Sequence, residues 1–218
     1  WLQIRREKPD YVTMWGWGVM NPTAIQEAAN IRFPMENFIG VWWSGSEGDV
    51  LPAGEAAHGY KSLAMHNTGS DFPIYKDLKK FVYDSGKAAG DGTSAGTVLY
   101  NRGLYAAMLA TEAARQAQAM TGKKDVTPGD MRNAMEQFSI DEARMTAIGL
   151  PNFAPSFSVS CENHGGPGLA AIQQWDAKTQ KWSMISDFIK TDDEVIGKLV
   201  AEDSAAYAKE NNIPAQCS

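Results

Sequence analysis

The sequence has 218 residues, 44% of them hydrophobic, which is enough to bury a substantial core and argues against a disordered chain. The formal net charge is −6, and acidic and basic residues are interspersed, so the sequence offers no basic surface of the kind that binds a nucleic-acid backbone. No apolar run approaches the roughly 20 residues that cross a bilayer.

The chain opens on WLQIRREKPD, which lacks the apolar core of a signal peptide. Residues 1–8 have the pattern of the last turns of an amphipathic helix, and no capping residue precedes them. We therefore expect the chain to start inside a helix, as a fragment, a cleavage product or the ordered remnant of a longer protein.

The first third of the chain is predicted to alternate strands and helices. The strand segments are β-branched and aromatic, and Pro22 suits the first turn of a helix, where its missing N–H has no partner to lose. The expected strands are 11–15, 38–43 and 60–66, and the expected helices are 22–31 and 51–57. Such strands pair in parallel through right-handed crossovers, and ligands bind beyond their carboxyl ends.

The middle of the chain is predicted to be helical, and strands return toward its end. The expected helices are 74–85, 97–120, 128–138 after an N-cap at Thr127, 141–148, and a closing helix from a cap at Asp192 or Asp193 to about residue 211. The expected strands are 157–160, 169–175 and 181–188, the last two forming a hairpin across 176–180. This order favours a chain that crosses more than once between two lobes, with a single doubly wound sheet as the alternative.

Glycine-rich stretches do not match nucleotide-binding loops. Neither 16–18 nor 90–96 has the G-x-G-x-x-G spacing at a turn from strand to helix. Lys87 and Lys123 follow glycines but lack the neighbouring hydroxyl residue that would hold magnesium in a phosphate-binding loop. We therefore predict no nucleotide cofactor.

Hydrolase and metal motifs are also missing. Ser44 and Ser46 lie in a glycine-rich stretch that does not fit G-x-S-x-G. His58, His66 and His164 are far apart and form no helical or hairpin metal pair, although folding could still bring two of them together. The sequence therefore predicts a protein that is not an enzyme and binds no metal.

The two cysteines leave two possibilities open. Unpaired thiols are usual in a reducing compartment, whereas a cysteine one residue from the end suggests a staple for the tail. A disulfide between Cys161 and Cys217 would contribute on the order of 4 kcal/mol in the chain-entropy model. Its presence would indicate an oxidising compartment.

Tryptophans mark the ends of two predicted strands. Trp15 and Trp17 flank the end of the first, and Trp42 and Trp43 end the second. Neighbouring parallel strands that end in this way place large flat side chains together at the edge where ligands bind, although core packing is the alternative. Because successive strand residues face opposite ways, each pair is expected to have one core member and one cleft member.

The order of these segments resembles the carboxy-terminal half to two-thirds of the type I periplasmic solute-binding proteins that serve ABC importers, the branched-chain amino-acid class. The stretches that carry the resemblance are PDYVTMWGWG, NFIGVWW, GEAAHGY, KDLKKFVYDSGK, VLYNRGLYAAMLATEAARQA, SCENHGG, AIQQWDAKTQKWSMISDFI, AAYAKEN and the final cysteine. They cover nearly the whole chain. The cysteine pair resembles the terminal disulfide of a subgroup of this family.

The resemblance implies an α/β fold of the type I periplasmic-binding-protein kind, with two Rossmann-like lobes of parallel sheet flanked by helices. It assigns residues 1–68 to part of lobe two, 69–153 to part of lobe one, and 154–218 to the closing strands and the C-terminal helix returning to the hinge and lobe two. It also implies that further strands precede residue 1. The isolated chain is then expected either to share strands in a homo-oligomer or to remain bound to its other half.

Ligand contacts can be carried over at single positions. Trp17 falls where amino-acid binders place an aromatic side chain over the ligand, and Trp42 falls near the acid that receives the ligand's ammonium group. A tryptophan cannot form that salt bridge, so an aromatic or flat, carboxylated solute is expected in place of a typical α-amino acid. Tyr100 falls near a tyrosine that opens the long helix of lobe one, and Arg102 could meet a carboxylate or lie in solvent.

This assignment makes Trp17 and Trp42 the cleft members of their pairs and leaves Trp15 and Trp43 closer to the core. Three weaker candidates for ligand binding follow strand ends: Asn21, Ser44 and His66. Glu47 and Asp49 are expected to be solvated loop acids.

The sequence thus predicts a periplasmic or otherwise extracytoplasmic solute-binding component of an ABC importer, with a signal peptide in its precursor and no cofactor. It would capture a small aromatic carboxylate or amino-acid-like solute by lobe closure and dock on the permease subunits, without binding nucleic acid. The alternative is the ligand-sensing domain of a receptor or regulator, which an appended kinase or DNA-binding domain would reveal. A third possibility is an α/β enzyme without recognised motifs, which substrate turnover would reveal.

Overall fold

The computed structural model describes residues 1–214 and 217, and the chain divides into two compact units. The larger unit comprises Trp1–Ala107, Glu142–Pro155 and Ala170–Phe188. The smaller unit comprises Met108–Asp141, Ser156–Leu169 and Ile189–Ser218. Each unit is therefore built from three separate stretches of the chain.

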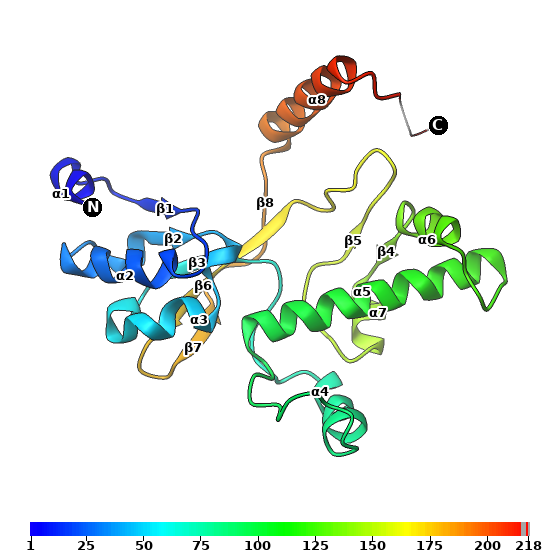
Figure 1. Cartoon of the computed structure of the whole chain (residues 1–218), viewed down its shortest axis with the longest axis horizontal. Helices are drawn as coiled ribbons and strands as arrows, with labels where there is room; N and C mark the ends of the chain where they lie inside the picture. Colours follow the sequence, from blue (N-terminus) through cyan, green and yellow to red (C-terminus); the bar gives the residue numbers. More distant parts are fainter. Residues whose placement is uncertain (215–216, 218) are drawn as a thin grey trace. The chain divides into compact units, whose positions relative to one another are not determined.

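The larger unit contains a mixed sheet in the order β1-β2-β3-β6-β7 (Figure 1). Its strands are β1 (Val12–Met14), β2 (Phe38–Gly40), β3 (Lys61–Ala64), β6 (Leu169–Asp176) and β7 (Lys181–Met184). The first three are parallel, as predicted, and β6 and β7 form the predicted antiparallel hairpin. The antiparallel pairing of β3 with β6, which joins the hairpin to the parallel strands, was not predicted.

Helices and short 3₁₀ turns complete the core of the larger unit. They are α1 (Leu2–Glu7), α2 (Met20–Asn30), η1 (Met35–Asn37), α3 (Glu47–Val50) and η3 (Leu51–Ala57). Ile25 and Ala28 of α2 pack in one buried cluster with Phe38, Tyr60 and Trp175. The helix begins two residues before Pro22, which still lies in the first turn, where a missing N–H costs no hydrogen bond.

Strand β2 is shorter than the predicted 38–43 because the chain turns early after it. The amide of Val41 still donates to Met14 O at 3.0 Å, which continues the pairing with β1. The amide of Ser44 then donates to Val41 O at 2.8 Å and closes the 3₁₀ turn η2 (Trp42–Ser44). The two tryptophans predicted at the end of a strand therefore lie in a turn.

The predicted helices of the middle and end of the chain are present. They are α4 (Ile74–Leu78), continued by a π turn η4 (Lys79–Tyr83), then α5 (Val98–Thr121), α6 (Pro128–Met135), α7 (Glu142–Ala147) and α8 (Asp193–Glu210). Thr127 caps α6 through a capping box with Asp130, and Asp192 caps α8 by accepting from the amides of Glu194 and Val195. None of the helices described is long and apolar enough to span a membrane.

The smaller unit has little sheet. Strand β4 (Ser139–Ile140), which was not predicted, pairs antiparallel with β5 (Phe157–Ser158). Strand β8 (Ile189–Lys190) pairs with β6, whose first residue Leu169 belongs to the same unit. The predicted disulfide between Cys161 and Cys217 is present and closes a sequence separation of 56 residues.

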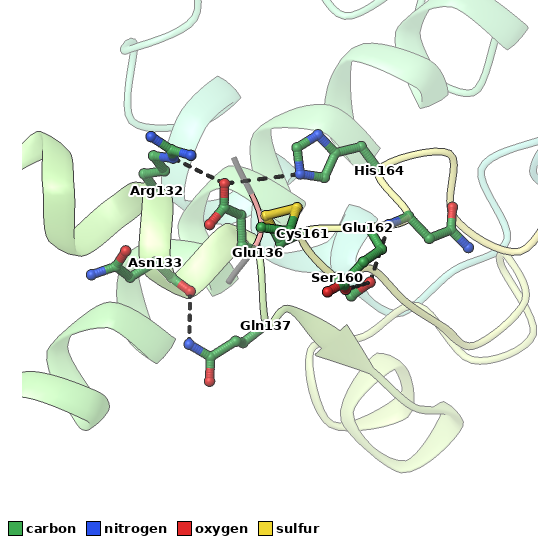
Figure 2. A network of polar contacts seen from close by, with 10 residues as sticks. Arg132, Asn133, Glu136, Gln137, Ser160, Cys161, Glu162 and His164 are labelled. Atoms are coloured by element: carbon green, nitrogen blue, oxygen red, sulfur yellow. Dashed lines mark hydrogen bonds and ion pairs between the residues drawn. A yellow bond between two sulfur atoms is a disulfide. The ribbon is translucent and has the colours of Figure 1, made fainter. Parts of the chain in front are cut away.

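The disulfide lies in a loop held by local polar contacts, shown in Figure 2. We call residues 160–168 the cysteine loop. Ser160 Oγ donates to Glu162 Oε2 at 3.1 Å and accepts from the amide of Asn163 at 3.1 Å. Outside the loop, Glu136 of the smaller unit pairs with Arg132 at 2.9 Å and meets His164 Nε2 at 3.9 Å. The contacts of Ser160 are exposed to solvent and join residues no more than three apart, whereas the contact of His164 joins the loop to the end of α6.

Candidate functional site

Four tryptophans from two strand ends meet in one cluster, as predicted. The ring centroids of Trp42 and Trp43 are 5.0 Å apart, and Trp17 lies 5.2 Å from Trp43. Trp15 lies 5.9 Å from Trp42 and 6.4 Å from Trp43, and both of these pairs are edge-to-face. The register explains the meeting, because Met14 is paired with Gly40 and both strands end at the same edge.

The predicted division into core and cleft members is wrong. Trp15 is 70% exposed, Trp17 66% and Trp43 41%, and Trp42 is half-buried. The prediction assumed that strand alternation continues through these residues, whereas both strands end before them and η2 turns the second pair outward. All four indoles are therefore available at the surface of the larger unit.

The backbone beneath this cluster is held by side chains. We call residues Trp42–Gly45 the tryptophan turn. Each of its four carbonyl groups accepts a hydrogen bond from a different side chain: Trp42 O from Arg102 Nη2 at 2.9 Å, Trp43 O from Asn21 Nδ2 at 3.2 Å, Ser44 O from Tyr60 Oη at 3.1 Å, and Gly45 O from Gln173 Nε2 at 2.7 Å. The donors lie on α5, α2, the residue before β3, and β6. The turn is thus fixed from four directions before any ligand arrives.

Three of these donors are fully buried. Asn21, Tyr60 and Gln173 expose 1% of their surface or less. Asn21 Nδ2 also donates to Asp49 Oδ1 at 2.7 Å, and Gln173 Nε2 also donates to Ser62 Oγ at 2.9 Å. Asn21 therefore serves the turn rather than a ligand, which departs from its predicted role.

Glycines permit the close approach of these elements. A Cβ at Gly40 would lie 2.0 Å from the hydroxyl oxygen of Tyr60, and one at Gly45 would lie 2.1 Å from Ser62 Oγ. A Cβ at Gly16 would lie 2.1 Å from Asn21 Oδ1. Glycines at two adjacent strand ends were the sequence signal for this tight packing, and they were not interpreted in this way.

Glu47 and Asp49 are not solvated acids, contrary to expectation. Asp49 is buried and accepts from the amide and the hydroxyl of Ser46 at 2.8 and 2.7 Å. The two carboxylate oxygens of Glu47 accept from the amide of Val98 at 3.0 and 3.3 Å, which caps the start of α5. Burial raises the pKa of Glu47, although the amides that donate to it act in the opposite direction.

Arg102 is the one cation among the predicted residues, and it is half-buried. Within the described part of the chain, its guanidinium donates to Trp42 O through Nη2, so further N–H groups of the guanidinium can serve a ligand. Burial lowers the pKa of Arg102, and the Asp49 carboxylate opposes that shift. The structure thus places a charged donor on the backbone carbonyl of Trp42.

The other predicted residues have structural partners. Ser44 is buried, and its Oγ donates to Gly16 O at 3.2 Å. His66 is buried and stacks on Phe153 at 5.1 Å, and burial lowers its pKa. The hydroxyl of Tyr100 lies 2.8 Å from that of Tyr83, and burial raises the pKa of Tyr100 to about 12.

The larger unit also has an open cavity of about 740 Å³ that none of the predicted residues lines. Its walls are Asn67, Glu142, Asn152, Ala154, Pro155, Met184, Ile185, Ser186, Asp187 and Phe188. Asn67 donates to Asn152 O, and Glu142 accepts from the amide of Asn152. Because these polar groups bind one another, the cavity gives no indication of a particular solute.

The described residues contain no group of three or more His, Cys, Asp or Glu side chains that could hold a metal ion. Chemically, the site therefore consists of indole faces, one guanidinium and a rigid backbone turn. Such a surface can stack a flat solute and bind an anionic group.

Comparisons with known proteins agree with this description. A family model described as periplasmic binding protein matches residues 1–180. The chain belongs to the periplasmic binding protein family, whose members are extracytoplasmic solute-binding proteins rather than enzymes. The predicted resemblance and the predicted fold class are confirmed. No curated protein matches the sequence.

Solved structures give the same fold. A structure described as an ABC transporter permease from the Pseudomonas fluorescens group is 40% identical, covers 100% of this chain and 52% of its own, and superposes with a TM-score of 0.92. A branched-chain amino acid ABC transporter from Thermus thermophilus with bound valine is 18% identical over 87% of this chain and 48% of its own, with a TM-score of 0.64. A solute-binding protein from R. palustris in complex with 4-hydroxybenzoate is 13% identical over 90% of this chain and 50% of its own, with a TM-score of 0.56. The chain spans about half the length of these structures.

Proposed function

We propose that the protein to which this chain belongs is the periplasmic solute-binding component of an ABC importer, and that its solute is a small aromatic carboxylate. The observation that carries the proposal is the cluster of four tryptophans at the surface, two of which lie on a turn whose four carbonyls are all hydrogen-bonded by side chains. In this proposal residues 1–68 belong to lobe two, 69–153 to lobe one, and 154–218 to the closing strands and helix. The solute is captured between the lobes, and the loaded protein docks on the permease subunits.

The charges around the cluster favour a carboxylate over an amino acid. Asp49 is committed to Asn21 and Ser46, and Glu47 is committed to the amide of Val98. Neither acid is free to receive the ammonium group of an amino acid. Arg102, in contrast, has donors to spare for a carboxylate.

Aromatic stacking supplies the other half of the recognition. Indole rings on an immobile backbone bind a flat solute without the entropic cost of ordering the turn. Structural relatives bind valine in one case and 4-hydroxybenzoate in another, so the fold accommodates both chemistries. The tryptophans favour the second for this protein.

The test is a binding screen by calorimetry and thermal shift with benzoate, 4-hydroxybenzoate, valine, leucine and short amides. We expect the aromatic carboxylates to raise the melting temperature and to quench tryptophan emission. Trp42→Ala and Arg102→Met should each weaken binding at least about tenfold, which is the loss of one stacking or charge-assisted contact. Tyr207→Ala, at an exposed aromatic residue of α8, is the matched control and should bind normally.

Stabilisation by valine or leucine without any effect of the aromatic acids would show that the proposed solute class is wrong. Binding of the aromatic acids that is insensitive to both Trp42→Ala and Arg102→Met would show that the solute lies elsewhere in the protein.

A further inference from the structure

Two side chains link the segment Trp42–Glu47 to the start of α5, one from each side. The carboxylate of Glu47 accepts a hydrogen bond from the amide of Val98, the first residue of α5. The guanidinium of Arg102, one turn further along α5, donates a hydrogen bond to the carbonyl of Trp42. The four residues span five positions on α5 and six positions around the tryptophan turn, so the two bonds close a small ring.

These two bonds differ from the others that hold the turn. Asn21, Tyr60 and Gln173 donate from fully buried positions within the sheet and α2. Glu47 and Arg102 are only half-buried, and both carry charge. Half-exposed charged groups can exchange a protein partner for water at small cost, whereas buried polar groups cannot. The ring can therefore open while the three buried bonds stay closed.

The amide of Val98 makes the state of this ring observable. It is the first N–H of α5, and the first N–H groups of a helix have no partner within the helix. Glu47 supplies its acceptor from 51 residues away in the sequence. Thr97 Oγ1 serves a different amide, that of Tyr100. Protection of the Val98 amide from hydrogen exchange thus reports the Glu47 bond.

We infer that Glu47 and Arg102 act together as a latch that holds the tryptophan turn against α5 and so positions Trp42. With the latch closed, Trp42 is fixed both by its neighbour Trp43, anchored to Asn21, and by its own carbonyl on Arg102. With the latch open, only the buried bonds remain and the indole of Trp42 moves more freely. This inference rests on the proposed function in one respect: in that proposal the two segments belong to different lobes, so that the latch would retain the solute.

The experiment measures hydrogen exchange at the Val98 amide in the full chain without any solute. Glu47→Ala should raise its exchange rate about tenfold or more, because the bond is lost. Glu47→Gln should keep most of the protection, because the amide oxygen of glutamine still accepts from Val98. Arg102→Met should also raise the rate, although Arg102 does not bond to Val98. Glu55→Ala and Arg5→Met, at exposed residues of the same charges, are the matched controls and should leave it unchanged.

Unchanged exchange at Val98 in Arg102→Met would overturn the latch, because the two bonds would then be independent.

A second experiment measures the binding kinetics of 4-hydroxybenzoate. Glu47→Ala should increase its dissociation rate constant more than it decreases its association rate constant, and Glu47→Gln should restore the slow dissociation. Equal dissociation from wild type and Glu47→Ala would overturn the role in retention. Absence of binding to the wild type would contradict the proposed solute, whereas the exchange result would still decide the latch.

Discussion

The tryptophan turn and the cysteine loop are both irregular segments, but they are held by opposite means. The bonds to the turn come from side chains 16 to 128 residues away in the sequence, and three of the four donors are buried. The loop is held mostly by side chains within three residues of their partners, by the contact of His164 with Glu136, and by one covalent bond. The turn is thus rigid because the fold surrounds it, whereas the loop is only tethered.

The difference fits the proposed function, in which the turn binds the solute and the disulfide holds the tail. A surface that binds a solute gains affinity when its backbone is ordered in advance, which many distant hydrogen bonds can achieve. A disulfide limits the conformations open to the C-terminal segment and needs no hydrophobic core around it to do so. The disulfide and the glycines under the turn can each be removed separately, and the two changes should affect different units of the chain.

Removal of the disulfide should affect the smaller unit alone. In Cys161→Ser combined with Cys217→Ser, the free energy of unfolding of that unit should fall by about 4 kcal/mol, from the chain-entropy cost of its long loop. All seven tryptophans lie in the larger unit, so their emission should not change while the circular dichroism melt moves to lower temperature. Reductant added to this variant should have no further effect. A shift of tryptophan emission together with the melt would show that the tether also supports the turn.

Crowding of the tryptophan turn should affect the larger unit. The Cβ of Gly40→Ala would meet the buried hydroxyl of Tyr60, so the free energy of unfolding should fall by about 1–3 kcal/mol, and emission should change. Gly103→Ala is the control, since it adds a Cβ to an exposed position of α5 with open space around it. That substitution should stabilise the protein by up to about 1 kcal/mol. Equal effects of the two substitutions would refute the tight packing described for the turn.

The smallest effect is the pH dependence contributed by His66. Burial against Phe153, with the charge of Arg102 nearby, lowers its pKa below the value of the unfolded chain, about 6.5. The unfolded state therefore binds the proton more readily, and the free energy of unfolding should decrease as the pH falls through and below 6.5. Chemical denaturation of wild type and His66→Gln at several pH values isolates this contribution from that of the other histidines. Parallel pH profiles for the two proteins would show that His66 does not titrate as described.

The sequence predicted those features that depend on neighbours along the chain. The strand and helix order, the caps at Thr127 and Asp192 and the hairpin of β6 and β7 all follow from local patterns, and each is present. The meeting of the four tryptophans was predictable as well, because parallel strands end at a common edge.

The sequence could not predict which polar residues serve the backbone and which face a solute. Asn21, Ser44 and Glu47 look alike as loop residues near strand ends, and the first two were predicted to bind ligand. Whether each is buried depends on which element packs over it, and hydrogen-bond partners up to 128 residues apart leave no periodic signal. The tertiary structure decided that the donors converge on Trp42–Gly45, because only the folded sheet brings α2, α5 and β6 to the same turn.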